Sequence, residues 1–234
     1  MDQVFMNWSG GKDACLSLYR LLLNRKVSIG SLLTTVSERY KRISMHGVRE
    51  ELLRMQAEKL GIPLKTVYLP ENASMEAYDR IMGDHLEALR TEGYTTAVFG
   101  DIFLDDLREY RERRLAILEL KALFPLWGEN TLQLARHFID TGFKAVVCCV
   151  NGAVLDKSFA GRSFDHAFLQ DLPPGVDPSG EHGEFHSFVY DGPIFGEPVT
   201  FDLGEVVERS YGTGTDKGVW DTRFFFCDLL PRDQ

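Results

Sequence analysis

Apolar and polar residues follow two different periods along the first 150 residues. Residues 4–8 are apolar almost throughout, as in a buried strand, and apolar side chains then recur at helical spacing over residues 14–22. The alternation continues, with strands predicted at 29–36, 65–70, 95–99 and 146–150 and helices at 48–60, 75–90, 105–123 and 131–140. Strands separated by helices imply right-handed crossovers, so we expect an α/β fold with a mostly parallel, Rossmann-like sheet and helices on both faces.

After residue 150 the elements become shorter. The sequence predicts one helix at 163–172, a turn-rich loop at 173–180, and β runs at 185–190, 199–201, 206–211 and 222–227. We therefore expect two domains, residues 1–150 with the parallel sheet and residues 151–234 as a smaller α+β domain.

Two adjacent glycines stand between the first strand and the first helix, in the segment Ser9-Gly10-Gly11-Lys12-Asp13, here called the glycine loop. Glycine lets backbone N–H groups approach an anion, and the positive end of the helix dipole points at the same place. Lys12 adds a positive charge, and the Ser9 hydroxyl can cap the helix or donate to a phosphate oxygen. The loop therefore predicts a phosphate site, the alternative being an ordinary strand-to-helix turn.

Two well-known phosphate loops are excluded by spacing. A Walker A loop needs a glycine where Met6 stands and Ser or Thr where Asp13 stands. The dinucleotide fingerprint needs three glycines at fixed intervals, and only two are present here, side by side.

Two further polar groups lie where ligands of such a sheet bind, at the carboxyl ends of strands. Gly100-Asp101 directly follows the predicted strand 95–99. Asp101 suits a magnesium ion or a ribose hydroxyl, and the alternative is a carboxylate that caps a helix. His46 follows the second strand and could border a nucleotide, although a lone histidine is more often structural.

A second cluster of reactive side chains follows the turn-rich loop, where residues 180–186 read Gly-Glu-His-Gly-Glu-Phe-His. In extended geometry Glu184 and His186 face one side, and Gly183 lets Glu181 fold back. Three functional interpretations stay open: a zinc or manganese site, although the spacing matches no standard set; a pocket for a cationic or amine group; and acid–base catalysis by His186. The alternative is a solvated turn with a cluster of charges.

Composition narrows the class of partner. The net charge of −9 argues against a broad nucleic-acid surface, and the arginines of residues 108–114 are interrupted by glutamates, as on a solvated helix face. No long apolar span or signal peptide is apparent, so we expect no membrane partner and a cytoplasmic protein. The four cysteines form no Cys-x-x-Cys pair and are interpreted as buried, inert thiols.

The glycine loop resembles the PP-loop of the ATP pyrophosphatases, written Ser-Gly-Gly-Xaa-Asp-Ser, which holds the phosphates of ATP while pyrophosphate leaves. Further matches are Gly100-Asp101-Ile102, Pro125-Leu126-Trp127 and the Gly-Glu-Xaa-Gly-Glu-aromatic segment near residue 180. With these, the chain resembles the diphthine–ammonia ligase family over most of its length. The resemblance implies a nucleotide domain of the adenine nucleotide α-hydrolase (HUP) type and a smaller domain that carries the second motif.

The resemblance also implies a reaction, in which a substrate carboxylate attacks the α-phosphate of ATP, pyrophosphate leaves, and ammonia displaces AMP. ATP and Mg²⁺ are the implied cofactors, and ammonia and a carboxylate-bearing acceptor, on a protein or a small molecule, are the implied partners. The candidate ATP-binding residues are Ser9, Gly10, Gly11, Lys12, Asp13, His46, Gly100 and Asp101, with Asp13 and Asp101 as metal ligands. The candidate acceptor residues are Arg114, Glu181, His182, Gly183, Glu184 and His186. The candidate catalytic residues are Lys12, Asp13, Glu181, Glu184 and His186.

Two departures from the family pattern concern the chemistry. Ala14 stands where the PP-loop usually has its last Ser, which removes one hydroxyl donor. Ligases that make diphthamide usually read Glu-Gly-Gly-Glu-Tyr-Glu, whereas this chain has His182 and His186 in place of a glycine and the last glutamate. A pocket with two acids and two imidazoles suits a less cationic acceptor, and a His-bearing bacterial subgroup is associated with cobalamin salvage.

Other function classes stay open beside the amide ligase. A protein that senses ATP without turnover is favoured by Ala14, but such a sensor needs no second reactive cluster. A tRNA-modifying PP-loop enzyme that transfers sulfur needs reactive cysteines near the loop, and the net charge of −9 disfavours tRNA. The sequence leaves a homo-oligomer open.

Overall fold

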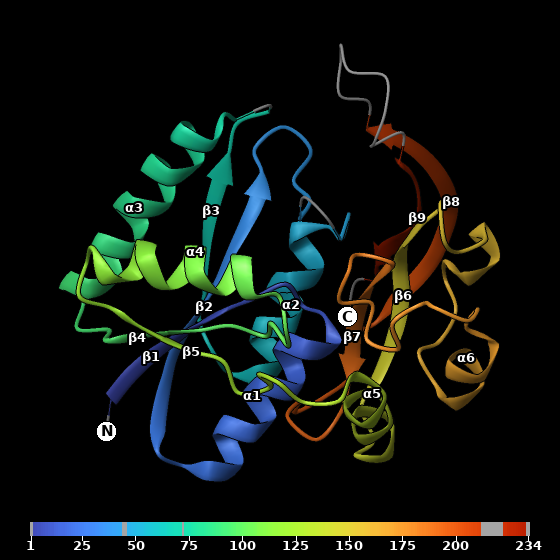
Figure 1. Ribbon diagram of the computed structural model, residues 1–234, viewed down its shortest axis with the longest axis horizontal. Helices are drawn as coiled ribbons and strands as arrows, with labels where there is room; N and C mark the ends of the chain where they lie inside the picture. The colour runs from blue at the N-terminus through green and yellow to red at the C-terminus, as the bar shows by residue number, and fades with distance from the viewer. Residues whose placement is uncertain (1, 44–45, 72, 212–221, 233–234) are drawn as a thin grey trace.

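The computed structural model describes residues 2–43, 46–71, 73–211 and 222–232. These residues form two β-sheets that occupy opposite halves of the view in Figure 1. The first sheet has five strands in the order β3-β2-β1-β4-β5, and the second has four in the order β7-β6-β9-β8. The molecule therefore joins one α/β unit to one antiparallel unit.

All strand pairs of the first sheet are parallel. Its strands are β1 (Asp2–Asn7), β2 (Val27–Ser37), β3 (Leu64–Leu69), β4 (Thr96–Val98) and β5 (Lys121–Leu123). Its helices are α1 (Lys12–Asn24), α2 (Glu50–Leu60), α3 (Met75–Thr91) and α4 (Asp105–Ala116). The predicted α/β class is confirmed, and the strand order reverses between β1 and β4, where ligands of open sheets bind.

Helices cover both faces of this sheet, as the alternation along β1 shows. Val4 and Met6 belong to the hydrophobic cluster that includes the buried faces of α1 and α2. Phe5 points to the opposite face and clusters with Leu89 of α3 and Leu115 of α4. Burial on both faces explains why residues 4–8 are apolar almost throughout.

The second unit contains the antiparallel sheet and two short helices. Its elements are α5 (Thr131–Asp140), β6 (Lys144–Asn151), a 3₁₀ turn (Lys157–Phe159), α6 (His166–Asp171), β7 (Phe185–Asp191), β8 (Phe201–Tyr211) and β9 (Thr222–Pro231). The sequence predicts the strand at 146–150 as part of the first domain, but β6 pairs only with β7 and β9 among the described strands. An apolar run does not specify which sheet it joins.

The predicted helix at 105–123 is wrong in its second half. Helix α4 ends at Ala116, Glu119 adopts a left-handed φ of 57°, and residues 121–123 form strand β5 beside β4. Residues 117–123 carry no glycine or proline that would stop a helix. The free edge of β4 therefore overrides the local helix preference, because the edge offers backbone hydrogen bonds to this segment.

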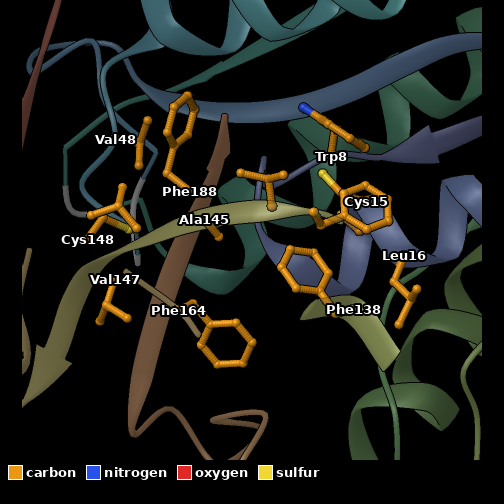
Figure 2. Close-up of a cluster of buried hydrophobic side chains, with 14 of the residues drawn as sticks. Trp8, Cys15, Leu16, Val48, Phe138, Ala145, Val147, Cys148, Phe164 and Phe188 are labelled. Atoms are coloured by element: carbon orange, nitrogen blue, oxygen red, sulfur yellow. The ribbon is translucent and has the colours of Figure 1, made fainter. Parts of the chain in front are cut away.

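The two units share one hydrophobic core. Figure 2 shows Phe138, Phe164 and Phe188 of the second unit in one cluster with Trp8 and Cys15 of the first. Strand β7 lies next to α1 and contacts the backbone of the glycine loop through residues 187 and 189. The loop that precedes α1 is therefore held between the two units.

The described residues also bear on the cysteines and on membrane-spanning helices. All four cysteines are free and buried, which confirms their predicted burial, and burial raises the pKa of each thiol. No helix within the described ranges is long and apolar enough to cross a membrane.

Candidate active site

The glycine loop needs glycine for both conformation and space. Gly10 has φ of 74°, and a methyl group there would lie 2.6 Å from Oε1 of Gln56 and from Cδ2 of Leu53. A methyl group at Gly11 would lie 3.1 Å from the carbonyl oxygen of Ser187. Ser9 does not cap the helix, because the N-cap of α1 is Gly11, and the Oγ of Ser9 accepts a hydrogen bond from the N–H of Gly11 at 3.3 Å.

Gly100 brings the end of β4 close to the same helix. A methyl group at Gly100 would lie 3.0 Å from the backbone nitrogen of Ala14 and 3.0 Å from the carbonyl carbon of Asp13. Because these atoms belong to the backbone of α1, they cannot move aside as a flexible side chain can. The glycine therefore fixes Asp101, the next residue, near the first turn of α1.

Lys12 points into the second unit. Its side chain is 6% exposed, and its Nζ donates hydrogen bonds to Oδ2 of Asp13 at 2.8 Å and to the carbonyl oxygen of Ser179. The ammonium also lies over the rings of Phe164 and Phe185, 5.9 Å and 5.5 Å from the centroids. A buried cation needs polar partners of this kind, and these contacts tie the two predicted motifs together.

Three carboxyl groups approach one another beside Lys12. They belong to Asp13, Asp101 and Glu181. Burial is the largest cause and raises the pKa of Asp13 and of Asp101, whereas Lys12 lowers that of Asp13 and Arg111 lowers that of Asp101. The Asp13 carboxylate raises the pKa of Asp101 further, and Asp177 does the same to Asp13. Burial also raises the pKa of Glu181 to about 7, with smaller contributions from Asp13 and Asp101 in the same direction.

Glu181 crosses from the second unit to the first. Its Oε1 accepts hydrogen bonds from the N–H groups of Ile102 at 2.7 Å and Phe103 at 3.4 Å, in the loop after β4. The ring of His182 packs edge-on against Phe103, with centroids 5.0 Å apart. Both motif residues therefore face the carboxyl end of the parallel sheet, where the sequence predicts the ligand.

Glu184 stabilises the loop that carries Glu181, here called the carboxylate loop (residues 177–186). Its side chain is buried, Oε1 accepts from the N–H of Asp177 at 3.1 Å, and Oε2 accepts from the N–H of His182 at 2.9 Å. Asp177 in turn accepts from the N–H of Ser179 at 2.8 Å and from the hydroxyl of Thr131 at 2.6 Å. Gly183 supplies the turn with φ of 82°. Sequence reasoning missed Asp177.

His46 and His186 stack on each other where the two units meet. Their ring centroids are 4.4 Å apart at an interplanar angle of 25°. Burial lowers the pKa of His46 to about 4 and that of His186 well below its ordinary value, so both imidazoles are neutral near pH 7. Within the described residues, Nδ1 of His46 and Nε2 of His186 are buried without a hydrogen-bond partner. His46 also borders the glycine loop, since a methyl group at Gly11 would lie 3.2 Å from its Cε1.

The structure brings together most of the predicted residues but not Arg114. The guanidinium of Arg114 donates to the carbonyl oxygen of Asp79 at 2.9 Å, against α3 and away from Asp101. Arg111, one helical turn earlier, lies 3.1 Å from the Asp101 carboxylate and packs over the ring of Phe99 at 4.3 Å. Helical periodicity alone leaves several arginines of α4 as candidates, so only the structure identifies Arg111.

Gln56 is a further residue that the sequence did not point to. It is fully buried on α2, accepts a hydrogen bond from Nε1 of Trp8 at 3.0 Å, and donates to the carbonyl of Gly10 at 3.0 Å and of Val189 at 2.5 Å. The N–H of Val189 donates to the same Gly10 carbonyl at 2.9 Å. A buried amide with every bond made fixes the glycine loop against β7.

The carboxylates fit a magnesium ion only in combination with a ligand. The described residues contain no group of three or more His, Cys, Asp and Glu side chains arranged to hold a metal. Asp13 and Asp101 are oxygen donors of the kind that Mg²⁺ prefers, and their mutual repulsion in a buried site would be relieved by a cation. Mg²⁺ is commonly held by one or two carboxylates together with substrate phosphates.

Comparison with known proteins follows the same division into two units. The model of the diphthamide synthase N-terminal domain matches residues 2–121, and that of the diphthamide synthase C-terminal domain matches residues 130–221. The chain belongs to the diphthamide synthase family. The resemblance inferred from the motifs is therefore confirmed at the level of the family.

Curated members of this family are similar over most of the chain. The diphthine–ammonia ligase of Homo sapiens is 26% identical over 226 residues, which cover 86% of this chain and 84% of that protein. The enzyme of Danio rerio is 28% identical over 233 residues, covering 86% and 87%. That of Schizosaccharomyces pombe is 23% identical over 266 residues, covering 97% of this chain but 42% of the longer relative.

Proposed function

We propose that this protein is an ATP-dependent amide ligase that forms AMP and pyrophosphate. The observation that carries the proposal is the meeting of the two motifs in one buried site. Lys12 of the glycine loop bonds to Ser179, and Glu181 bonds to the loop after β4, although each pair is separated by more than 75 residues. The diphthine–ammonia ligases among its relatives favour the same reaction class.

In the proposed first half-reaction the glycine loop binds the phosphates of ATP. Backbone N–H groups at the start of α1 and the Lys12 ammonium would bind the phosphate oxygens, and Asp13 and Asp101 would hold Mg²⁺, which would neutralise part of the phosphate charge. An oxygen of the acceptor carboxylate attacks the α-phosphorus, and the bond to pyrophosphate breaks. The ion pair with Arg111 would hold the Asp101 carboxylate in place for this role.

In the second half-reaction ammonia attacks the acyl carbon and AMP leaves with the electron pair of the C–O bond. The attacking nitrogen must lose a proton, and we assign Glu181 as the proton acceptor. Its pKa of about 7 suits a base at neutral pH, and its Oε2 accepts no hydrogen bond from the described residues. Glu184 positions this base through the carboxylate loop rather than acting on substrate.

The acceptor is proposed to be less cationic than diphthine. His186 stands where the diphthamide-forming ligases have a glutamate, and an imidazole supplies no negative charge. Its pKa lies well below its ordinary value because the ring is buried, so it supplies no positive charge near pH 7 either. A pocket with one negative charge fewer attracts a quaternary ammonium group less strongly. A carboxylic acid with a neutral or anionic body, such as an intermediate of cobalamin salvage, suits the site better.

The test incubates the protein with ATP, Mg²⁺ and ammonium and screens carboxylic acids, including diphthine-bearing protein and small acids. Equimolar AMP and pyrophosphate with formation of an amide is the expected result. Formation of ADP and phosphate would contradict adenylation. ATP binding with no turnover for any acceptor would favour the second candidate, an ATP sensor, for which Ala14 in place of the usual hydroxyl is the favouring observation.

A further inference from the structure

Ser187 touches the glycine loop from the opposite unit. It lies on β7, is 3% exposed, and its Oγ accepts a hydrogen bond from the backbone N–H of Lys12 at 3.2 Å. Two residues later on the same face of β7, the N–H of Val189 donates to the carbonyl of Gly10. The strand that follows the carboxylate loop is thus bonded directly to the loop that binds phosphate.

The first turn of α1 has no hydroxyl of its own. Its residues are Lys12, Asp13, Ala14 and Cys15, and the N-cap Gly11 makes no side-chain capping bond. The Ser9 hydroxyl already accepts from the N–H of Gly11. Ser187 therefore supplies the second hydroxyl at this helix end, and supplies it from the other unit.

The hydroxyl of Ser187 has a donor left for a ligand. A serine hydroxyl accepts through its lone pairs and donates through one hydrogen. The Lys12 N–H uses one lone pair, and within the described residues no acceptor takes the Ser187 hydrogen. Ser187 lies beside the backbone of Lys12 at the amino end of α1, where an anion is stabilised, so rotation of the hydroxyl can direct this hydrogen at a phosphate oxygen.

We propose that Ser187 binds a phosphate oxygen of ATP by donating its hydroxyl hydrogen, so that the second unit completes the phosphate site. The proposal rests on the proposed function, because it takes the glycine loop as the site of the phosphates. It adds a contact that neither the glycine loop nor the carboxylate loop contains. Ser187 directly follows His186 in β7, so the residue proposed to bind phosphate is continuous with the carboxylate loop.

The test measures the affinity of ATP, pyrophosphate and adenosine for the full chain by calorimetry. Ser187→Ala is expected to weaken ATP and pyrophosphate roughly tenfold, since a hydrogen bond to a charged group is lost, and to leave adenosine unchanged. Ser187→Thr, which keeps the hydroxyl, should bind both within about twofold of wild type. Ser17→Ala is the matched control, because Ser17 is also fully buried on α1 but has no hydrogen-bond partner within the described chain.

Several results would overturn the assignment. Unchanged or tighter binding of pyrophosphate to Ser187→Ala would mean that the hydroxyl fills the phosphate position without contributing to it. Equal losses for adenosine and pyrophosphate would mean that Ser187 only supports the fold. If the alanine variant does not fold, Ser187→Cys keeps a similar size with a weak donor, and full pyrophosphate affinity there would equally refute the proposal. A wild-type chain that binds neither ATP nor pyrophosphate would instead refute the proposed function.

Discussion

The glycine loop and the carboxylate loop face each other in one site, but different forces shape them. The glycine loop depends on its own backbone: a left-handed Gly10, no side-chain cap on α1, and glycines where a methyl group would clash. The carboxylate loop depends on side chains, because Glu184 and Asp177 accept hydrogen bonds from its backbone N–H groups. The glycine loop can be recognised in the sequence because its backbone conformation requires glycine. The conformation of the carboxylate loop depends instead on side-chain hydrogen bonds that form only in the folded protein.

The difference teaches how two roles are divided between similar residues. Glu181 and Glu184 stand three residues apart, yet the first bonds to the opposite unit and the second closes its own loop. From the motif alone, both carboxylates are candidates for the same catalytic role. Only the direction of their hydrogen bonds separates a group available for chemistry from a group that positions it.

The largest expected effect comes from Lys12→Ala, which removes the only side chain of the glycine loop that bonds to the carboxylate loop in the described structure. A buried Asp13 would lose its partner and the phosphates their cation, so ATP affinity should fall roughly 100-fold or more. Calorimetric titration with ATP measures this affinity, and Lys26→Ala, at an exposed position, is the control. Unchanged affinity would remove the glycine loop from the ATP site.

Glu181→Gln should lower kcat about 100-fold near pH 8 while ATP affinity stays close to wild type. The pKa of Glu181 is raised to about 7, so the carboxylate becomes available as a base as pH rises through 7, and the wild-type rate should rise over the same window. The variant should lack this limb of the pH–rate profile. A variant that keeps the limb would assign it to another group.

Gly10→Ala tests the claim that backbone rules shape the glycine loop, and Gly61→Ala is its matched control. Both glycines have left-handed φ values, 74° and 67°, but a methyl group meets nothing within 4 Å at Gly61. At Gly10 it meets Leu53 and Gln56, both fully buried, and Gln56 is held by three hydrogen bonds. The Gly10 variant should lose about 1–3 kcal/mol more unfolding free energy than the control, measured with urea. Equal losses would show that the loop can adjust.

Glu184→Gln tests the positioning role in the carboxylate loop. One amide N–H of the new side chain would face a backbone donor, either Asp177 or His182, so the variant should lose about 1–3 kcal/mol of unfolding free energy. Turnover should fall with it, and ATP affinity should not. The exposed Glu58→Gln is the control. Full stability with lost turnover would return Glu184 to a role in the chemistry.

The sequence predicts the parts of this site that depend on neighbouring residues. Three segments are recognisable because turns and strand ends follow local rules: the glycine loop, Gly100-Asp101 at the end of β4, and residues 180–186. The sequence does not predict which of these segments contact each other, since each contact joins residues far apart in the chain. The contacts are those of Lys12 with Ser179, Glu181 with Ile102, and His46 with His186. The same limit explains β5, whose strand conformation depends on the free edge of β4.

The smallest expected effect concerns the stacked histidines. His46 borders the glycine loop, and His186 is the last residue of the carboxylate loop. Burial lowers the pKa of His46 to about 4, so the unfolded chain binds a proton below pH 6.5 that the folded chain does not. The stability that the neutral ring contributes is therefore present above pH 6.5 and is lost as pH falls toward 4. Between pH 7 and 5, His46→Phe should lose roughly 2–4 °C less in Tm than wild type, and the exposed His85→Asn should behave as wild type. An equal loss in His46→Phe would mean that the acid sensitivity of this junction comes from other groups.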